Sequence, residues 1–398
     1  MANQVDQKVY DLCKAEEKDV ISFTETLVNM DSGSDDYPDL HAKQAVLMDM
    51  LKELGADVRV VEAASPREGT YNIVGEWKGD GKARILYLNH YDTVWPKGEV
   101  AKRPFTVKDG VAYGPGVSDS QCNFAALRAL MRILQTLGEK NFDRITMLFN
   151  CDEEKSSLGS RDLIRELAAR HDVVYSMDGG GHNGEEVNTS ARGGSFCELH
   201  ITGVESHSGM APEKGRNAGY EMAHQMLQMR DLSNKEMGTD VNWTMGNFGI
   251  KSNVIPGNAM VHANIRVSSM AECDRVENEI RERIKNTLIP DCTIEVKYWH
   301  GRPPFQPNEH TDALAAKAGE IGAEINWPVK GLPCGGGTDA NYSSQEAPTL
   351  EALGLGGGGA HTPDEFWPLA NIVPRLYLIV RLTRETMRGS ILPIGTRR

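Results

Sequence analysis

The sequence predicts an α/β fold: a main domain with a mostly parallel sheet, into which a smaller α+β domain is inserted. Short apolar runs alternate with amphipathic segments in the first half of the chain, which is typical of a sheet covered by helices. Between turn-rich segments near residues 190 and 303 the order of elements changes to that of an antiparallel sheet with two helices. We therefore expect residues 1–192 and 304–398 to form the main domain and residues 193–303 the inserted one.

The first half supplies the elements of the predicted parallel sheet. Helical spacing covers residues 7–30 and 41–54, and an amphipathic helix spans 122–138, where Gly138 ends it. A further helix is expected over 157–170, with Ser156 and Ser157 as its N-cap. The intervening apolar runs predict strands, and two of them (ILYL and ITMLF) are continuously apolar, as strands buried on both faces are.

The inserted segment has a different pattern. Strands are expected at 196–204, 244–250, 259–267 and 293–299, with helices at 216–231 and 271–288. The two strands at the junctions (SARGGSF and GRPPFQP) should run side by side, because the chain leaves and re-enters the main domain there.

Composition excludes several classes of protein. Hydrophobic residues make up 40% of the 398 residues, which argues against disorder. The net charge is −13, which argues against nucleic-acid binding. The seven cysteines form no C-x-x-C pair, so neither a zinc ribbon nor a disulfide framework is indicated. No apolar run suits a secretion signal or a membrane span, and we expect a cytoplasmic protein that binds no membrane.

Five residues that can bind metal ions follow the predicted strands or precede predicted helices. His90, Glu154 and Asp178 lie at the ends of three apolar strands, Asp119 at a helix start, and His361 in a glycine-rich loop. Taken alone, Asp119 could be a helix cap and Glu154 part of a solvated acidic turn. Together they should converge, because parallel strands end at one edge of a sheet. Two imidazoles and three carboxylates suit one or two divalent ions (Zn, Mn or Co).

Two neighbours of these residues have the chemistry to assist. Asp92 can accept the other ring N–H of His90 and so orient it. Glu153, next to Glu154, can take a proton from a water activated by the metal ions and pass it to a leaving nitrogen.

These segments resemble the M20 metallopeptidase and amidohydrolase family, especially its glutamate carboxypeptidase (carboxypeptidase G-type) branch, over essentially the whole chain. The similar segments are NHYDTVWPKG, YGPGVSD, FNCDEEKSSLGS, GGGTDAN and GGGGAHTPDEF. The resemblance implies that the five residues are the metal ligands, with Asp119 bridging, that Asp92 orients His90, and that Glu153 is the general base and acid.

The inserted segment resembles the family's lid or dimerisation domain. In GVESHSGMAPEKGRNA, the resemblance implies that His207 stabilises an oxyanion, although a hydrogen-bonded turn histidine is the alternative. It also implies that Asn253 and Arg266 contact the substrate and that Arg302 binds a substrate carboxylate. Arg266 could instead form a structural ion pair. Gly336 and Thr338 are weaker candidates for the pocket wall, and a homodimer through this domain is expected.

One segment departs from the family pattern. Relatives usually continue after the bridging aspartate with an acidic residue or methionine and then Lys-Gly-Gly, whereas this chain reads Asp119-Ser120-Gln121-Cys122-Asn123. The occupancy of both metal positions and the substrate therefore stay open. We expect a hydrolase of the amide C–N bond in a small substrate with a carboxylate, such as an N-acyl amino acid or dipeptide. The alternative is an aminohydrolase that releases ammonia. A non-catalytic binding protein is disfavoured, because Glu153 and all five ligands are present.

Overall fold

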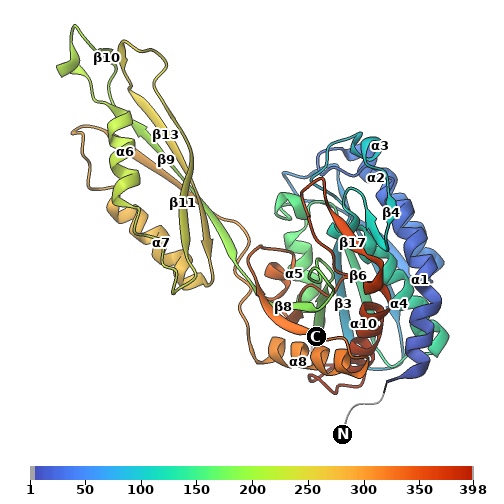
Figure 1. Ribbon diagram of the computed structural model, residues 1–398. Coiled ribbons are helices and arrows are strands. Elements are labelled where there is room, and N and C mark those ends of the chain that lie inside the picture. Colours follow the sequence, from blue (N-terminus) through green and yellow to red (C-terminus); the bar gives the residue numbers. More distant parts are fainter. Residues whose placement is uncertain (1–4, 397–398) are drawn as a thin grey trace. The chain divides into compact units, whose positions relative to one another are not determined.

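The computed structural model describes residues 5–396 (Figure 1). Within that range the chain divides into two compact units, one formed by residues 191–306 with 335–337 and the other by the remaining residues. The predicted inserted segment, 193–303, lies within the first of these, which we call the inserted unit. The run 335–337 was predicted in the main domain but packs with the inserted unit.

The main unit is built on a six-stranded sheet, with strand order β1-β2-β6-β3-β7-β16. The central pairs β6–β3 and β3–β7 and the edge pair β7–β16 are parallel, whereas β1–β2 and β2–β6 are antiparallel. The predicted α/β class is thus confirmed. The strands are β1 (Asp57–Glu62), β2 (Tyr71–Lys78), β3 (Arg84–His90), β6 (Arg144–Asn150), β7 (Val173–Ser176) and β16 (Thr349–Leu350).

Helices cover both faces of this sheet because its central strands β3, β6 and β7 are apolar on both faces. Along β3, Ile85 and Tyr87 pack in one cluster and Leu86 and Leu88 in another, as alternate side chains of a strand must. The first, larger cluster lies under α1, α2, α4, α8 and α10, and the second under α5 and α9. These helices are α1 (Gln7–Val28), α2 (Tyr37–Glu53), α4 (Cys122–Leu137), α5 (Arg161–Ala169), α8 (Glu309–Glu324), α9 (Ala340–Ser343) and α10 (Ile372–Met387).

Short elements complete the main unit. One small sheet joins β17, β5 and β4, and another joins β15 to β8. Their bounds are β4 (Thr106–Lys108), β5 (Val111–Tyr113), β8 (Glu186–Ala191), β15 (Lys330–Cys334) and β17 (Phe366–Pro368), and a short α-helix, α3, spans Glu99–Lys102. All seven cysteines are free thiols, as expected.

The inserted unit is an antiparallel sheet, in the order β11-β13-β9-β14, with α6 and α7 packed on one face (Figure 1). The predicted junction strands, β9 and β14, pair directly. A two-stranded ladder of β10 and β12 extends this unit. The elements are β9 (Gly193–Thr202), β10 (Ser206–His207), α6 (Ala218–Gln228), β11 (Asp240–Phe248), β12 (Val254–Ile255), β13 (Asn258–Val267), α7 (Met270–Arg283) and β14 (Thr293–His300).

One predicted helix start was wrong in a way that matters for the site. The helix expected from residue 157 begins at Arg161, with Ser160 at its N-cap. Ser156 and Ser157 instead adopt left-handed φ values of 63° and 53°. Their backbone N–H groups donate to the carbonyls of Glu153 and Asp152, which closes a tight turn after β6. The serines therefore shape the acidic turn instead of capping the helix.

No helix among residues 5–396 has the length and apolar character needed to cross a bilayer.

Behind the sheet, the buried ring of His171 is held as a neutral imidazole. Its Nδ1 lies 2.6 Å from the carbonyl oxygen of Leu167 and must donate there, so its Nε2 accepts from the Thr146 hydroxyl at 2.8 Å. Burial lowers the pKa of His171 to about 4. Between pH 4 and the usual histidine pKa of about 6.5, His171 is therefore protonated in the unfolded chain and neutral in the folded chain.

We expect the contribution of neutral His171 to the free energy of unfolding to be complete above pH 6.5 and to fall as the pH drops towards 4. The loss should be about 3 kcal/mol. His171→Gln removes the titration. The difference in free energy of unfolding between wild type and variant should therefore shrink from pH 7 to pH 4 in urea melts. A difference that is constant with pH would contradict this account.

Candidate metal centre

The five predicted ligands meet at the carboxyl end of the sheet. The parallel strands β3, β6 and β7 lead into His90, the turn with Glu154, and Asp178 respectively. Ligand atoms of His90, Asp119 and Glu154 all lie within 4.8 Å of one another, as do those of His90, Glu153 and Asp178. His361 joins them, with its Nε2 3.1 Å from Oε2 of Glu154.

The Asp119 carboxylate stands between the two histidines. Its Oδ1 lies 3.1 Å from Nε2 of His90, and its Oδ2 lies 3.2 Å from Nε2 of His361. On the His90 side, Oδ1 of Asp178 lies 4.0 Å from the same Nε2. The donors thus form two sets that share Asp119, one with His90 and Asp178 and the other with His361 and Glu154.

Asp92 orients His90 from behind. It is fully buried, and Nδ1 of His90 lies 3.1 Å from its carbonyl oxygen and 3.3 Å from its Oδ1. The same carboxylate accepts the backbone N–H groups of Glu153 and Glu154, at 3.1 and 3.3 Å. Asp92 therefore fixes both the imidazole and the acidic turn, which leaves the Nε2 of His90 facing the other donors.

The loop that presents Asp119 is held by a carboxylate that the sequence analysis did not single out. Buried Glu365 accepts the backbone N–H groups of Gly116, Ser118 and Asp119 at 2.8, 2.9 and 3.0 Å. Burial, and then the charge of Asp119, raise the pKa of Glu365 to about 7. The peptide bond between Asp119 and Ser120 is cis.

The acidic turn is anchored through Asp152, the first of the three adjacent carboxylates Asp152-Glu153-Glu154 that follow the ITMLFNC strand. Its carboxylate accepts the Gly159 N–H at 2.6 Å and the Ser160 hydroxyl at 2.5 Å. Burial raises the pKa of Asp152 to about 6. Because Asp152 points back to the start of α5, the next two carboxylates are left to face the cluster.

A glycine permits the loop before His361 to pass close to Asp178. A β-carbon at Gly354 would lie 2.1 Å from the carbonyl oxygen of Met177, so a larger residue would push the loop away. Asn123 ties the two segments, since it donates to that carbonyl at 2.7 Å and accepts the Leu355 N–H at 2.8 Å.

The electrostatics of the cluster fit divalent cations. Hydrogen bonds with Asp119 and Glu154 raise the pKa of His361 to about 11. Burial alone lowers the pKa of His90, but its contacts with Asp119 and Asp92 outweigh burial, so that the net pKa is well above the usual value. Both shifts report a strongly negative potential at the ring nitrogens. Imidazole and carboxylate donors in such a field suit Zn, Mn or Co ions.

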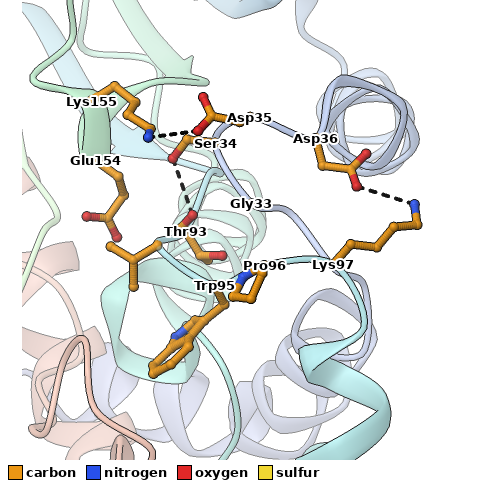
Figure 2. A pocket seen from close by; sticks show the side chains of 11 residues that line it. Gly33, Ser34, Asp35, Asp36, Thr93, Trp95, Pro96, Lys97, Glu154 and Lys155 are labelled. Carbon is orange, nitrogen blue, oxygen red and sulfur yellow. Dashed lines mark hydrogen bonds and ion pairs between the residues drawn. The ribbon is translucent and has the colours of Figure 1, made fainter.

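A cavity of about 410 Å³ adjoins the cluster in the main unit (Figure 2). Glu154 forms part of its wall, together with Val94, Trp95 and Pro96. Two ion pairs border it, Lys155 with Asp35 at 2.8 Å and Lys97 with Asp36 at 3.4 Å. The cavity therefore has an apolar wall and a charged rim.

Within the inserted unit, His207 and Asn253 lie close together. The strand residues His207 and Val254 are paired, and the Ser208 N–H donates to the carbonyl of Asn253 at 3.0 Å. The N–H groups of Gly209 and Met210 donate to Nδ1 of His207, at 3.2 and 3.1 Å. In the neutral ring the proton is therefore on Nε2, and the His207 residue is exposed.

The predicted arginines also lie in the inserted unit. Burial lowers the pKa of Arg266, and the nearby charges of Arg302 and Arg192 lower it further, so three cations lie close to one another. Arg302 donates to the carbonyl of Gly337 at 2.7 Å, next to the exposed Gly336. Thr338 belongs to the main unit, and its hydroxyl donates to Glu351 at 3.0 Å.

Comparison with known proteins shows the family. The pattern of the Peptidase family M20/M25/M40 matches residues 86–385. The chain belongs to this family. As a member it is a metal-dependent hydrolase that acts on C–N bonds, which confirms the predicted reaction type and the expectation of bound divalent ions.

The relatives span nearly the whole chain. The chain is 34% identical to carboxypeptidase G2 of Pseudomonas sp. (strain RS-16), over 98% of this chain and 94% of the relative. It is 26% identical to acetylornithine deacetylase of Vibrio campbellii, over 84% and 89%. Its fold is similar to the crystal structure of a tripeptidase from Staphylococcus aureus, with a TM-score of 0.79, 20% identity and coverage of 94% and 99%.

We expect Asp119→Ala to lose both ions, because each oxygen of Asp119 faces a different histidine. Asp178→Ala and Glu154→Ala should each weaken one site and leave the other. Isothermal titration with Mn²⁺ or Zn²⁺, with metal content measured after dialysis, gives the stoichiometry. A single ion retained by Asp119→Ala at wild-type affinity would show that the two sets do not share this carboxylate.

Proposed function

We propose that the protein hydrolyses the amide bond of an N-acyl amino acid or dipeptide that carries a free carboxylate. The observation that carries this proposal is the meeting of two histidines and three carboxylates at one edge of the sheet, with the carboxylate of Glu153 within reach of His90 and Asp178.

The five donors would hold two divalent ions. His90 and Asp178 with Oδ1 of Asp119 would hold one, and His361 and Glu154 with Oδ2 of Asp119 the other. When bound, such a pair of ions lowers the pKa of a water molecule and polarises the carbonyl of the scissile amide.

Glu153 would move the proton. Its backbone is tied to Asp92 by a hydrogen bond, and its side chain is buried among the donors, so its carboxylate has a fixed position. As general base, Glu153 takes a proton from the attacking water, and as general acid it gives that proton to the leaving nitrogen.

The arginine cluster supports a substrate with a carboxylate. The charges of Arg302 and Arg192 lower the pKa of Arg266, and Arg192 is itself paired with Asp240, so a substrate carboxylate would reduce the electrostatic cost at Arg266. A guanidinium group also matches a carboxylate with two parallel hydrogen bonds. We propose that Arg302 and Arg266, with Asn253, bind the carboxylate of the leaving amino acid, and that Gly336 and Thr338 line its pocket.

His207 has the tautomer that stabilising an oxyanion requires. Since its Nδ1 accepts two backbone N–H groups, its Nε2–H is left to donate. We propose that this N–H donates to the oxygen that becomes negative when the amide carbonyl is attacked.

The cavity beside Glu154 would take the acyl part of the substrate. A carbonyl at the metal centre has the amino acid on one side and the acyl group on the other, and the predicted ligand Glu154 forms part of the wall of this cavity (Figure 2). Its apolar wall of Val94, Trp95 and Pro96 favours a hydrophobic acyl group.

We also propose a cytoplasmic homodimer formed through the inserted unit. Strand β11 is an edge strand of its sheet, and large apolar side chains are exposed on β11, on α6 and just after β11. An edge strand with apolar neighbours is suited to pairing with a second copy across a twofold axis. The exposed side chains are Tyr220, Leu227, Met245, Phe248 and Ile250.

Glu153→Gln tests the proton transfer. The amide keeps the shape and the backbone hydrogen bond but cannot take a proton, so kcat should fall by about 10²–10⁴-fold with little change in metal affinity. Stopped assays on an N-acyl amino acid and metal titration measure the two effects. Wild-type kcat in a metal-loaded Glu153→Gln enzyme would refute the assigned role.

Arg302→Ala tests the carboxylate contact. We expect KM to rise at least about tenfold for substrates with a free carboxylate and to stay constant for their amides, because only the former gain an ion pair. Arg281→Ala, which removes an arginine paired with Glu277 on α7, is the matched control. Equal effects on both kinds of substrate would exclude a carboxylate contact.

A substrate panel separates amide hydrolysis from deamination. N-acyl amino acids, dipeptides and aminobenzoates are incubated with the metal-reconstituted enzyme, and ammonia is measured apart from the released amino acid. Release of an amino acid without ammonia supports the proposal. Release of ammonia alone would favour the aminohydrolase alternative, which the departure after Asp119 motivates.

A further inference from the structure

A lysine is buried behind the metal centre and has no role in the proposed reaction. Lys43 extends from α2, and its side chain is fully buried. Its Nζ donates to the hydroxyl of Ser32 at 2.8 Å and to Oε1 of Gln121 at 3.1 Å. Among residues 5–396 its ammonium has no carboxylate within ion-pair distance.

One acceptor of Lys43 belongs to the loop that supports Asp92. The carbonyl of Ser32 accepts the Thr93 N–H at 2.9 Å, and the carbonyl of Thr93 accepts the Ser34 N–H at 3.1 Å. The Ser34 hydroxyl then donates to Oδ2 of Asp92 at 2.8 Å. Hydrogen bonds through Ser32, Thr93 and Ser34 thus connect Lys43 to the Asp92 carboxylate, which orients His90.

The other acceptor belongs to the turn that presents Asp119. Gln121 is fully buried two residues after Asp119, and its backbone N–H donates to the carbonyl of Gly116 at 2.9 Å. Its side-chain amide contacts the carbonyl of Tyr91 at 3.5 Å. Lys43 therefore joins, at one ammonium, the two backbone segments on which Asp92 and Asp119 depend.

Burying the Lys43 ammonium between the two loops costs desolvation free energy. Burial lowers the pKa of Lys43 to about 7, although the charges of Asp31, Asp92 and Asp39 oppose the shift. A neutral donor would avoid that desolvation. The ammonium offers stronger hydrogen bonds to both acceptors, and its charge offsets part of the negative charge that the cluster concentrates.

We propose that Lys43 is a positioning residue for the metal centre. Lys43 holds the Ser32 loop and the Gln121 turn together, and so fixes the positions of Asp92 and Asp119. The inference rests on the proposed function for the identity of the ligands. It also gives a physical reason for the departure after Asp119: Gln121 stands where the family pattern has a lysine, and in this chain the ammonium reaches the same turn from α2.

Lys43→Met keeps an unbranched apolar stem, one atom shorter than lysine, but removes the donors. Loss of such an outer partner of a metal ligand typically costs about 10- to 100-fold in metal affinity or activity. We expect a loss of this size in Zn²⁺ or Mn²⁺ affinity, measured by competition with a chelator, and in kcat, with KM little changed. Lys52→Met, on the exposed side of the same helix, is the control and should behave as wild type.

The rescue variant separates positioning from simple stabilisation. A lysine side chain is one bond longer than glutamine, so Lys43→Met/Gln121→Lys brings an ammonium from the turn towards the place that the Lys43 ammonium occupies. We expect the double variant to recover at least about tenfold of the lost metal affinity and kcat. Failure to recover either quantity in a folded double variant would overturn the proposal.

If Lys43→Met does not fold, Ser32→Ala is measured instead, because it removes one acceptor and leaves the lysine in place. Ser32→Ala should also lower metal affinity, but by a smaller factor than the one expected for Lys43→Met. Metal affinity and kcat at wild-type values in Lys43→Met, or in Ser32→Ala, would overturn the proposal. Wild-type protein is measured first, since its failure to bind divalent ions would refute the proposed function and not the role of Lys43 alone.

Discussion

The fold of the main unit serves to bring one carboxylate, that of Asp119, between two histidines from distant parts of the chain. Like charges repel, so several carboxylates converge in a buried place only if cations share it or some of the carboxylates bind protons. The histidines respond to this field, and the pKa of His361 rises to about 11. The rest of the site supports that arrangement: Glu365 holds the Asp119 loop by three backbone N–H groups, and Asp92 holds His90 and the acidic turn.

Much of this could be predicted from the sequence because the signals are local and the topology is regular. Apolar strands that end in His90, Glu154 and Asp178 predict convergence, since parallel strands end at one edge of a sheet. The α/β class followed from the same alternation of elements. Helix starts were less reliable: α5 begins at Arg161, because the preceding serines are used to close the turn that presents Glu154.

Asp92 was predicted from its place two residues after His90, but Glu365 and Lys43 could not be found in the sequence. Glu365 lies about 246 positions from Asp119 in the chain, and Lys43 lies 78 positions from Gln121, so no local pattern links them. A buried lysine in an amphipathic helix looks like any surface lysine until the fold places it. Their chemistry depends on burial, which a single sequence does not report.

Anomalous diffraction from crystals grown with zinc would show where the bound ions lie. We expect two peaks about 3.5–4 Å apart, one beside His90 and Asp178 and the other beside His361 and Glu154, with one oxygen of Asp119 on each. A pair of ions that does not share Asp119, or ions bound away from these five residues, would contradict this expectation.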